Sequence, residues 1–364
     1  MANILILTTY RGFLMSSLKN RTGTTKTICV DDVIKMLARL GHCVECKYFE
    51  ELIDLKQYAH HYVIYASTED AGLMYKDYIE DTILLLKSSG AVLIPEFELF
   101  RAHHNKAIME GLRRLLHNDS FKTITSYAYA SKDSYFAAKD KPPMTFPVVV
   151  KPSAGAGSSG VKLAYDEKSL VKIISRISRV LHWEYNILYG YWLIERLWAL
   201  YWKLRGRPNE YFMPRAKKFI IQNFIPDLKF DYKVLVFDKK YYVLKRENRD
   251  NDFRASGSGK FIFPDSLKEV SGILDYARLF TTEIDSPFYS LDIGCDKSIY
   301  HLLEFQFMNF GPYTLQFSKW YFEHDGDKWK RIDGESDLET EYVNSIDAYI
   351  RRTQKNHSHG NAAV

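Results

Sequence analysis

The chain has 364 residues, of which 46% are hydrophobic and 26% are charged. This balance is typical of a globular protein and excludes a disordered, collagen-like or coiled-coil chain. The formal net charge of +5 gives no strong indication of nucleic-acid binding and fits an anionic small ligand equally well, so no nucleic-acid partner is expected. The first ten residues lack the basic segment of a signal peptide, and no run of about 18 apolar residues occurs, so a cytoplasmic location is expected.

The four cysteines are too few for a disulfide scaffold. Cys43 and Cys46 have C-x-x-C spacing, but there is no second pair. In a strand, positions three apart face opposite sides, so both are expected to be packing residues and not ligands.

The first hundred residues predict strands alternating with helices. Residues 3–10 form an apolar run typical of a buried strand, and Asp31 and Asp32 precede a helix that Gly41 is placed to end. Further strands are expected at 42–49, 61–67 and 91–94, with a helix at 77–89. This alternation predicts βαβ units and a parallel sheet, which we assign to a first domain at 1–100.

Residues 101–320 are expected to form a second, α+β domain, with helices at 105–117, 167–180 and 267–280. Strands are expected at 123–127, 148–151, 161–165, 218–225, 232–236, 241–245, 289–293 and 300–307. A C-terminal segment follows at 321–364, whose polar tail at 356–364 is expected to be disordered.

The most informative segment contains three glycines, Gly155, Gly157 and Gly160, in the spacing of the dinucleotide fingerprint. A dinucleotide loop must open a helix, but this one is expected to join two strands, which indicates a mobile flap. Backbone N–H groups of such a flap can approach phosphate oxygens closely. The alternative is a glycine-rich hairpin without a ligand. Lys151, at the end of an apolar strand, favours the flap because a buried lysine needs an anionic partner such as phosphate.

A second candidate site lies on the last two expected strands, 289–293 and 300–307. Asp292 and Glu304 fall on two strands joined by a short turn, and Gln306 shares a face with Glu304. Two carboxylates and an amide at one place suit a hard cation such as Mg²⁺ bridging ATP phosphates. The alternative is a polar strand face in solvent, which the flanking apolar residues disfavour.

Taken in order, these motifs resemble those of the ATP-grasp superfamily over about residues 1–320. The resemblance rests on an early lysine, a V-V-K-P strand with its flap, a hinge strand, a D-x-K-V strand, two arginines, and an acidic pair of strands: Lys106, Lys151-Pro152, Gly155–Gly160, Gln222–Ile225, Asp231-Tyr-Lys233-Val, Arg246, Phe253-Arg254-Ala-Ser256, Asp292 and Glu304-x-Gln306. It implies an ATP-grasp nucleotide domain preceded by a parallel-sheet α/β domain, and thus an α/β chain overall.

The resemblance also implies roles for individual residues. ATP-binding roles fall on the lysines, the flap, the hinge and the ribose side: Lys106, Lys151, Gly155, Gly157, Ser158, Ser159, Gly160, Gln222, Asn223, Phe224, Ile225 and Asp231. Asp227 is the alternative to Asp231 near the ribose. Catalytic roles fall on Arg246, Arg254 and Lys151, and Asp292, Glu304 and Gln306 would hold one or two Mg²⁺. The family usually has Asn where Gln306 stands, so Asn309 is an alternative ligand, and Ser256 stands where Asn is common.

The activity that the resemblance implies is ATP-dependent ligation. A small-molecule carboxylate would be activated as an acyl phosphate and joined to an amine, with ADP and phosphate released. The alternatives are a nucleotide-binding, non-catalytic scaffold or regulatory module, and a kinase acting on a hydroxyl or amide. Gln306 and Ser256 favour the non-catalytic alternative. The ligase is favoured by Lys151, Arg246, Asp292 and Glu304.

Residues 181–215 are expected to be an insert between flap and hinge. Its part at 183–207 is rich in Trp and Tyr interleaved with Arg and Lys. Such a segment can pack on the protein or on a second subunit, lie at a membrane interface, or stack on sugars or nucleobases. We favour packing, and with it a homo-oligomer, over membrane contact.

Overall fold

The computed structural model describes residues 1–19, 26–155, 160–179, 197–198, 200–202, 204–206, 216–249, 252, 258–297 and 299–360. The chain divides into two compact units. The first unit combines Met1–Ile124 with Ile225–Val364, and the second unit is Thr125–Phe224. The segments 1–100 and 321–364 therefore both lie in the first unit.

The N-terminal part of the first unit contains a parallel sheet, as the sequence predicts. Its strands run in the order β2-β1-β3-β4, and each neighbouring pair is parallel: β1 (Asn3–Thr8), β2 (Cys43–Tyr48), β3 (Tyr62–Tyr65) and β4 (Val92–Ile94). The helices that follow its strands are α1 (Val30–Arg39), α2 (Met74–Ser88) and α3 (Phe97–His104). Cys43 and Cys46 are exposed because β2 is an edge strand, so the expected packing role of these cysteines is wrong.

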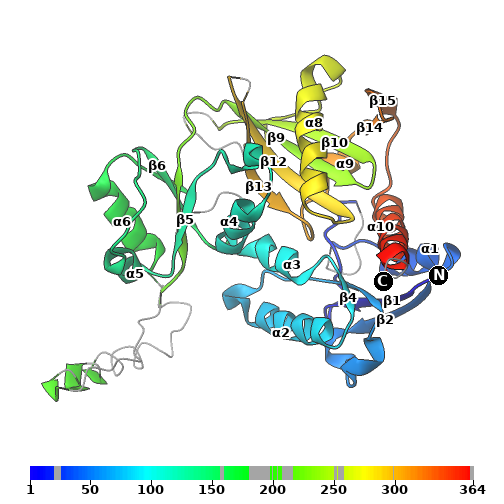
Figure 1. Ribbon diagram of the computed structural model, residues 1–364, viewed down its shortest axis with the longest axis horizontal. Coiled ribbons are helices and arrows are strands. Elements are labelled where there is room, and N and C mark those ends of the chain that lie inside the picture. The colour runs from blue at the N-terminus through cyan, green and yellow to red at the C-terminus, as the bar shows by residue number, and fades with distance from the viewer. Residues whose placement is uncertain are drawn as a thin grey trace. The chain divides into compact units, whose positions relative to one another are not determined.

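A long C-terminal helix, α10 (Leu338–Gly360), completes this part of the fold and was not predicted from the sequence. It lies beside α1 (Figure 1). Its Tyr342, Val343 and Ile346 join a hydrophobic core with the buried side chains of β1 and β3. Part of the tail expected to be disordered, 356–360, is helical, and 361–364 lie outside the described residues.

The other sheet of the first unit is antiparallel and has the order β13-β12-β9-β10-β14-β15, with β11 paired to β10. Its strands are β9 (Phe230–Phe237), β10 (Lys240–Glu247), β11 (Phe261–Ile262), β12 (Phe288–Asp296), β13 (Ile299–Gln306), β14 (Trp320–His324) and β15 (Trp329–Asp333). Helix α8 (Leu267–Glu283) packs on one face, where Val234, Leu291 and Phe305 share its core (Figure 1). On the opposite face, Leu235 and Phe237 join the core of the parallel sheet, and several charged side chains share that face.

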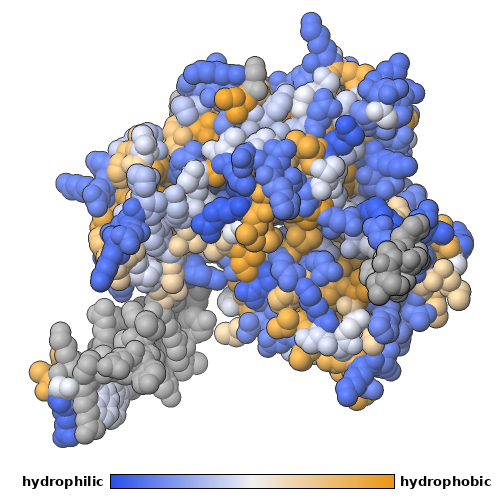
Figure 2. Space-filling view, in the orientation of Figure 1, coloured by the Kyte–Doolittle hydropathy of each residue, from blue (hydrophilic) through white to orange (hydrophobic). Residues whose placement is uncertain are grey.

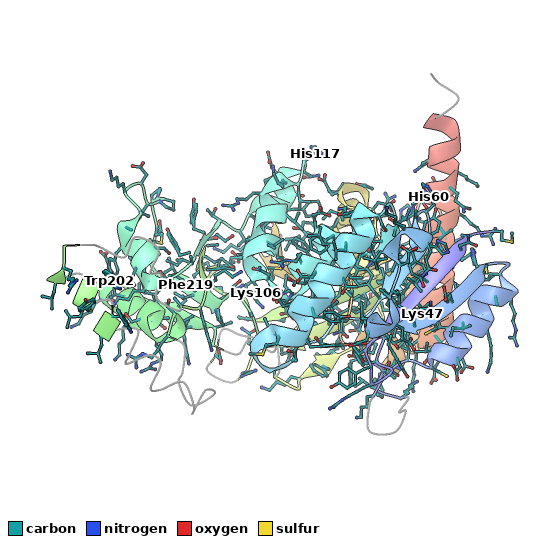
Figure 3. The ribbon with its side chains drawn as sticks, turned by 90° about the horizontal axis from the view of Figure 1, so that it is seen from below. Lys47, His60, Lys106, His117, Trp202 and Phe219 are labelled. Atoms are coloured by element: carbon teal, nitrogen blue, oxygen red, sulfur yellow. The ribbon has the colours of Figure 1, made fainter. Side chains whose placement is uncertain are left out.

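Two short helices complete the described elements of the first unit. Helix α4 (Lys106–Leu115) belongs to the same core as α8 through Met109, and α9 (Tyr313–Phe317) follows β13. Figure 3 labels Lys106, the first residue of α4, and His117, which follows its last turn. Short 3-10 turns lie at Phe49–Glu51, Leu55–Tyr58, Ala71–Leu73 and Asp119–Lys122.

The second unit is built on an antiparallel sheet of order β5-β8-β6-β7. Its elements are β5 (Ser126–Tyr129), α5 (Lys132–Ala137), β6 (Val148–Pro152), β7 (Lys162–Ala164), α6 (Glu167–Ile177) and β8 (Phe219–Asn223). Val148, Val150, Phe219 and Ile221 point to one face and form a core with α6. The expected strands that flank the glycine loop are confirmed, and they pair with each other as a hairpin.

No helix in the described part of the chain is both long and apolar enough to cross a membrane. Figure 2 shows hydrophobic and hydrophilic residues interspersed over the face in view. Most of the insert at 181–215 lies outside the described residues, and in its described part Leu197, Trp198 and Leu200 are exposed. Packing, membrane contact and oligomerisation through the insert stay predictions.

Candidate functional site

Charged residues of the antiparallel sheet are aligned across four neighbouring strands. Arg246 on β10 lies opposite Asp231 on β9, and Lys233, two residues further along β9, lies opposite Asp292 on β12. Asp292 in turn lies opposite Glu304 on β13. Directly opposed residues of an antiparallel pair project to the same face. Strand register therefore gathers these five side chains on the face that α8 does not cover.

Arg246 is the centre of this group. Its Nε and Nη2 donate to the two carboxylate oxygens of Asp231 at 2.6 and 2.9 Å, and Nη2 lies 2.7 Å from Oδ2 of Asp292. The side chains of Arg246 and Asp231 are 8% and 9% exposed. A guanidinium can serve two carboxylates at once because it presents several N–H donors in a planar fork. Arg246 thus holds together two buried carboxylates that would otherwise repel each other.

A second cation approaches Asp292 from the other side. Lys233 Nζ donates to Ser290 Oγ at 2.8 Å and lies 3.5 Å from Oδ1 of Asp292. Lys233 and Ser290 were not assigned roles from the sequence, although the D-x-K spacing of β9 places Lys233 on the same face as Asp231. Asp292 therefore has two cationic neighbours, whereas Asp231 has one direct cationic partner.

This difference in cationic neighbours gives Asp231 and Asp292 different pKa values. Burial raises the pKa of Asp231 to about 6, against the opposing charge of Arg246. Burial also acts to raise the pKa of Asp292, but the positive charges of Arg246 and Lys233 outweigh it and hold the pKa below its usual value. Arg246 is fixed as a cation because its two carboxylate neighbours overcome its burial and raise its pKa.

The outer strand β13 contributes Glu304 and Gln306, as expected from the sequence. Gln306 Nε2 donates to Glu304 Oε1 at 3.1 Å, and Lys106 Nζ, from the start of α4, lies 4.0 Å from the same oxygen. Glu304 is about one third exposed, whereas Lys106 is largely buried. Gln306 is paired across the sheet with Ser290. These contacts place Lys106 beside the two acidic strands, although it is far from them in sequence.

The carboxylates on this face of the sheet are suited to bind a magnesium ion that is also coordinated by the phosphates of a nucleotide. Asp292 and Glu304 are directly opposed, and rotation of the Gln306 amide would present its oxygen in place of Nε2. Within the described part of the chain, no three His, Cys, Asp or Glu side chains form a cluster that could hold a metal ion by themselves. Mg²⁺ in nucleotide sites needs only one or two carboxylates, because water and phosphate oxygens supply the other ligands.

The second unit carries two of the predicted residues, Lys151 and Gln222, on the sheet face opposite α6. Lys151 is paired with Ile220, and Val149 with Gln222, so these four side chains share that face. Val149, Ile220 and Gln222 are buried, and among the described residues Gln222 Oε1 has no hydrogen-bond partner. An apolar surface with one cation and one orphaned carbonyl fits an adenine nucleotide, which has an aromatic base, an exocyclic amine and anionic phosphates.

The glycine loop is described only at its ends. Gly155 and Gly160 both adopt positive φ, at 121° and 75°, which favours glycine. A Cβ added at Gly160 would lie 3.1 Å from Cγ of Pro152, so a side chain there would crowd Pro152, which further favours glycine. Gly157, Ser158 and Ser159 lie outside the described residues, as does Arg254 with its neighbours Phe253 and Ser256.

The expected hinge lies at the boundary between the two units. Asn223 at the end of β8 exchanges two bonds with Thr125: its Oδ1 accepts from Thr125 N at 2.7 Å, and its own N donates to Thr125 O at 3.0 Å. Phe224 is the last residue of the second unit and Ile225 resumes the first unit. Hinge roles for these residues stay predictions.

The structure thus assembles the predicted residues as two sets. The first unit brings together Lys106, Asp231, Arg246, Asp292, Glu304 and Gln306. The second unit places Lys151 and Gln222 on one face of its sheet, at the base of the loop that begins near Gly155.

No protein-family model matches the chain, and no curated relative matches it. Solved structures do match. D-cycloserine synthetase aligns with 94% of this chain and 98% of its own, at 14% identity and a TM-score of 0.47. The ATP-grasp ligase PsnB, complexed with a minimal precursor, aligns with 96% and 99%, at 12% identity and a TM-score of 0.48. D-alanine–D-alanine ligase from Bacillus anthracis aligns with 84% and 86%, at 14% identity and a TM-score of 0.46.

Of these solved structures, PsnB is an ATP-grasp ligase, the class that the ordered motifs of this chain resemble.

Proposed function

We propose that this chain is an ATP-dependent ligase that activates a carboxylate as an acyl phosphate and joins it to an amine, with release of ADP and phosphate. The observation that supports this most directly is the buried guanidinium of Arg246, held between Asp231 and Asp292 on the sheet face that also carries Glu304. An arginine fixed in this way is oriented before the substrate arrives, which is what stabilisation of a developing oxyanion requires.

Residues of both units are suited to roles in this reaction. Lys106 and Lys151 are suited to the phosphates of ATP, because both are cations that are largely or partly buried. Gln222 Oε1 is suited to accept a hydrogen bond from the amine of adenine. Asp292, Glu304 and Gln306 would hold Mg²⁺, which when bound would neutralise phosphate charge.

The role of the protein in this chemistry is mainly to position reactants and exclude water. An acyl phosphate hydrolyses readily, so the site must be shielded until the amine attacks. A hairpin loop with glycines at positive φ on both sides, Gly155 and Gly160, is suited to close over the phosphates.

One observation favours a second candidate, a nucleotide-binding module without catalysis. Gln306 donates to Glu304 Oε1, which occupies one lone pair that a metal ligand would need. Such a module would bind ATP and release no ADP above background. A kinase built on the same residues would release ADP and leave a stable phosphoester.

The test is a screen of carboxylates with Mg²⁺, ATP and hydroxylamine. Hydroxylamine is small enough to replace an unknown amine, and it traps an acyl phosphate as a hydroxamate. Glu304→Gln provides the blank, and Glu247→Gln, an exposed carboxylate at the end of β10, provides the matched control. Hydroxamate and ADP formed together, and lost only in Glu304→Gln, support the ligase. ADP with a phosphoester and no hydroxamate would replace the ligase with the kinase.

A further inference from the structure

Glu304 lies beside an irregularity in the sheet. Asp292 is paired with Glu304, but the next residue of β12, Ile293, is paired with Leu302, so Leu303 is an extra residue on β13. Leu302 and Phe305 are both buried in the α8 core although they are three residues apart. An unbulged strand would point two such residues to opposite faces. The bulge is therefore what lets Glu304 face the charged site while Leu302 and Phe305 both stay in the core.

Arg113 of α4 binds the backbone at this bulge. Its Nη1 donates to Leu302 O, and its Nη2 lies 3.3 Å from Leu303 O. Glu110, one turn earlier, accepts from Arg113 Nε at 2.8 Å. The side chains of both residues are at most 3% exposed. Because β13 is the edge strand of its sheet among the described strands, none of these pairs with its outer side, and the guanidinium binds the carbonyls instead.

The same helix face carries Lys106. Lys106, Glu110 and Arg113 are spaced i, i+4 and i+7, which places them on one side of α4. Met109, at i+3, lies on this side too and is buried in the α8 core. Helix α4 therefore contacts β13 at two points, through Lys106 at the carboxylate of Glu304 and through Arg113 at the bulge.

We propose that Arg113, oriented by Glu110, is a positioning residue that fixes the bulge of β13 and thereby the placement of Glu304 and Lys106 for Mg²⁺ and ATP phosphate. This inference takes its ligands, Mg²⁺ and ATP, from the proposed function. Its geometry rests on separate observations, the contacts of Arg113 with Glu110 and with the backbone of β13. Groups that orient a metal ligand without touching the metal commonly govern metal affinity. Arg113 acts through the backbone of Leu302 and Leu303 and contacts no substrate.

The test compares three variants of the full-length chain. Arg113→Met combined with Glu110→Met removes the clamp without leaving a buried charge unpaired. Arg113→Lys keeps a charge beside Glu110 but offers donors from a single nitrogen, so it cannot span Glu110 and both carbonyls. Leu274→Ala, a buried residue of α8 that makes none of the clamp contacts, is the control for a general loss of stability.

Two measurements are made on each variant. Hydrogen exchange of the segment 300–307 without nucleotide reports on the bulge, and a Mg²⁺ titration of ATP binding by calorimetry reports on Glu304. We expect the double variant to lose exchange protection at 302–304 and to need about ten times more Mg²⁺ for half-maximal ATP binding. At saturating Mg²⁺ the loss of ATP affinity should be smaller than this, because only the placement of Lys106 beside the phosphates is then impaired. Arg113→Lys should be intermediate, and Leu274→Ala should change neither quantity although it lowers the unfolding midpoint.

Unaltered exchange and Mg²⁺ dependence in the double variant would overturn the inference, and so would equal changes in Leu274→Ala. Absence of Mg²⁺-dependent ATP binding by the unmodified chain would overturn the proposed function and the positioning role together. In that case the exchange measurement would still decide whether the clamp exists. If the unmodified chain binds ATP in a Mg²⁺-dependent way, and the exchange and Mg²⁺ dependence of the Arg113 variants match it, the positioning role alone is overturned.

Discussion

Arg246 donates from Nε and Nη2 to the two carboxylate oxygens of Asp231, at 2.6 and 2.9 Å, across adjacent strands of the antiparallel sheet. Because Nη2 also lies 2.7 Å from Asp292, one guanidinium compensates two buried carboxylates. Removing a single partner from such a group leaves charge without compensation, which costs more free energy than the ion pair itself contributes.

The first prediction follows from this dependence. Arg246→Met should lower the free energy of unfolding by about 3–5 kcal/mol, because Asp231 and Asp292 are left buried without their shared cation. Arg246→Lys should cost less, since it keeps the charge but loses the two-pronged contact. Urea unfolding followed by circular dichroism measures both, with Lys122→Met in an exposed ion pair as control. Equal stability of Arg246→Met and the unmodified chain would contradict the arrangement.

The second prediction concerns pH. The pKa of Asp231 is raised by burial to about 6, above its ordinary value of 3.8. Between these two pH values the folded chain therefore holds a proton on Asp231 that the unfolded chain has released. The stability that this proton confers is full below about pH 4 and is lost as pH rises through about 6. The stability advantage of the unmodified chain over Asp231→Asn should therefore fall by on the order of 2–3 kcal/mol between these pH values.

Urea unfolding at a series of pH values measures this difference. Asp292 does not obscure this difference. Its pKa in the folded chain is lowered, so its contribution to the free energy of unfolding changes only at pH values below its ordinary pKa. A difference between the two proteins that stays constant from pH 4 to 6 would show that Asp231 titrates normally.

The third prediction tests the second unit. Lys151→Ala should weaken ATP binding by on the order of 2–3 kcal/mol, because a charge-assisted contact to phosphate is lost. The fold should persist, since Lys151 lies on the sheet face opposite the α6 core. Calorimetric titration with ATP and Mg²⁺ gives the affinity, and Lys172→Ala, an exposed lysine of α6, is the control. Unchanged affinity in Lys151→Ala would remove the phosphate assignment.

The fourth prediction separates the two candidate ligands on β13. Glu304→Gln should abolish turnover, because it removes the negative charge that Mg²⁺ needs, whereas Gln306→Asn should retain it with a neutral amide oxygen. Initial rates of ADP release at saturating Mg²⁺ measure both variants. If the two variants lose activity equally, Gln306 is not a simple amide ligand, and Asn309, which lies just beyond β13, becomes the next residue to change.

Much of the local structure follows from the sequence alone. The apolar run at 148–151 predicts β6, and the glycines after it predict a loop and not a helix start, because apolar residues resume as a strand after Gly160. The alternation around Glu304 and Gln306 predicts that both share a face, and the short turn before them predicts that Asp292 is their neighbour. These features depend on residues close in the chain, so their periodicity is visible in one sequence.

Other features were decided only by tertiary structure. The pairing of Arg246 with Asp231 and Asp292 depends on which strands are neighbours and in what register, and a one-residue shift would move every side chain to the other face. The contact of Arg113 with Leu302 and the packing of α10 beside α1 join segments about two hundred to three hundred residues apart. Hydrophobic periodicity reports that a residue is buried but not against what, because many partners can bury the same apolar surface and only the packed chain selects one.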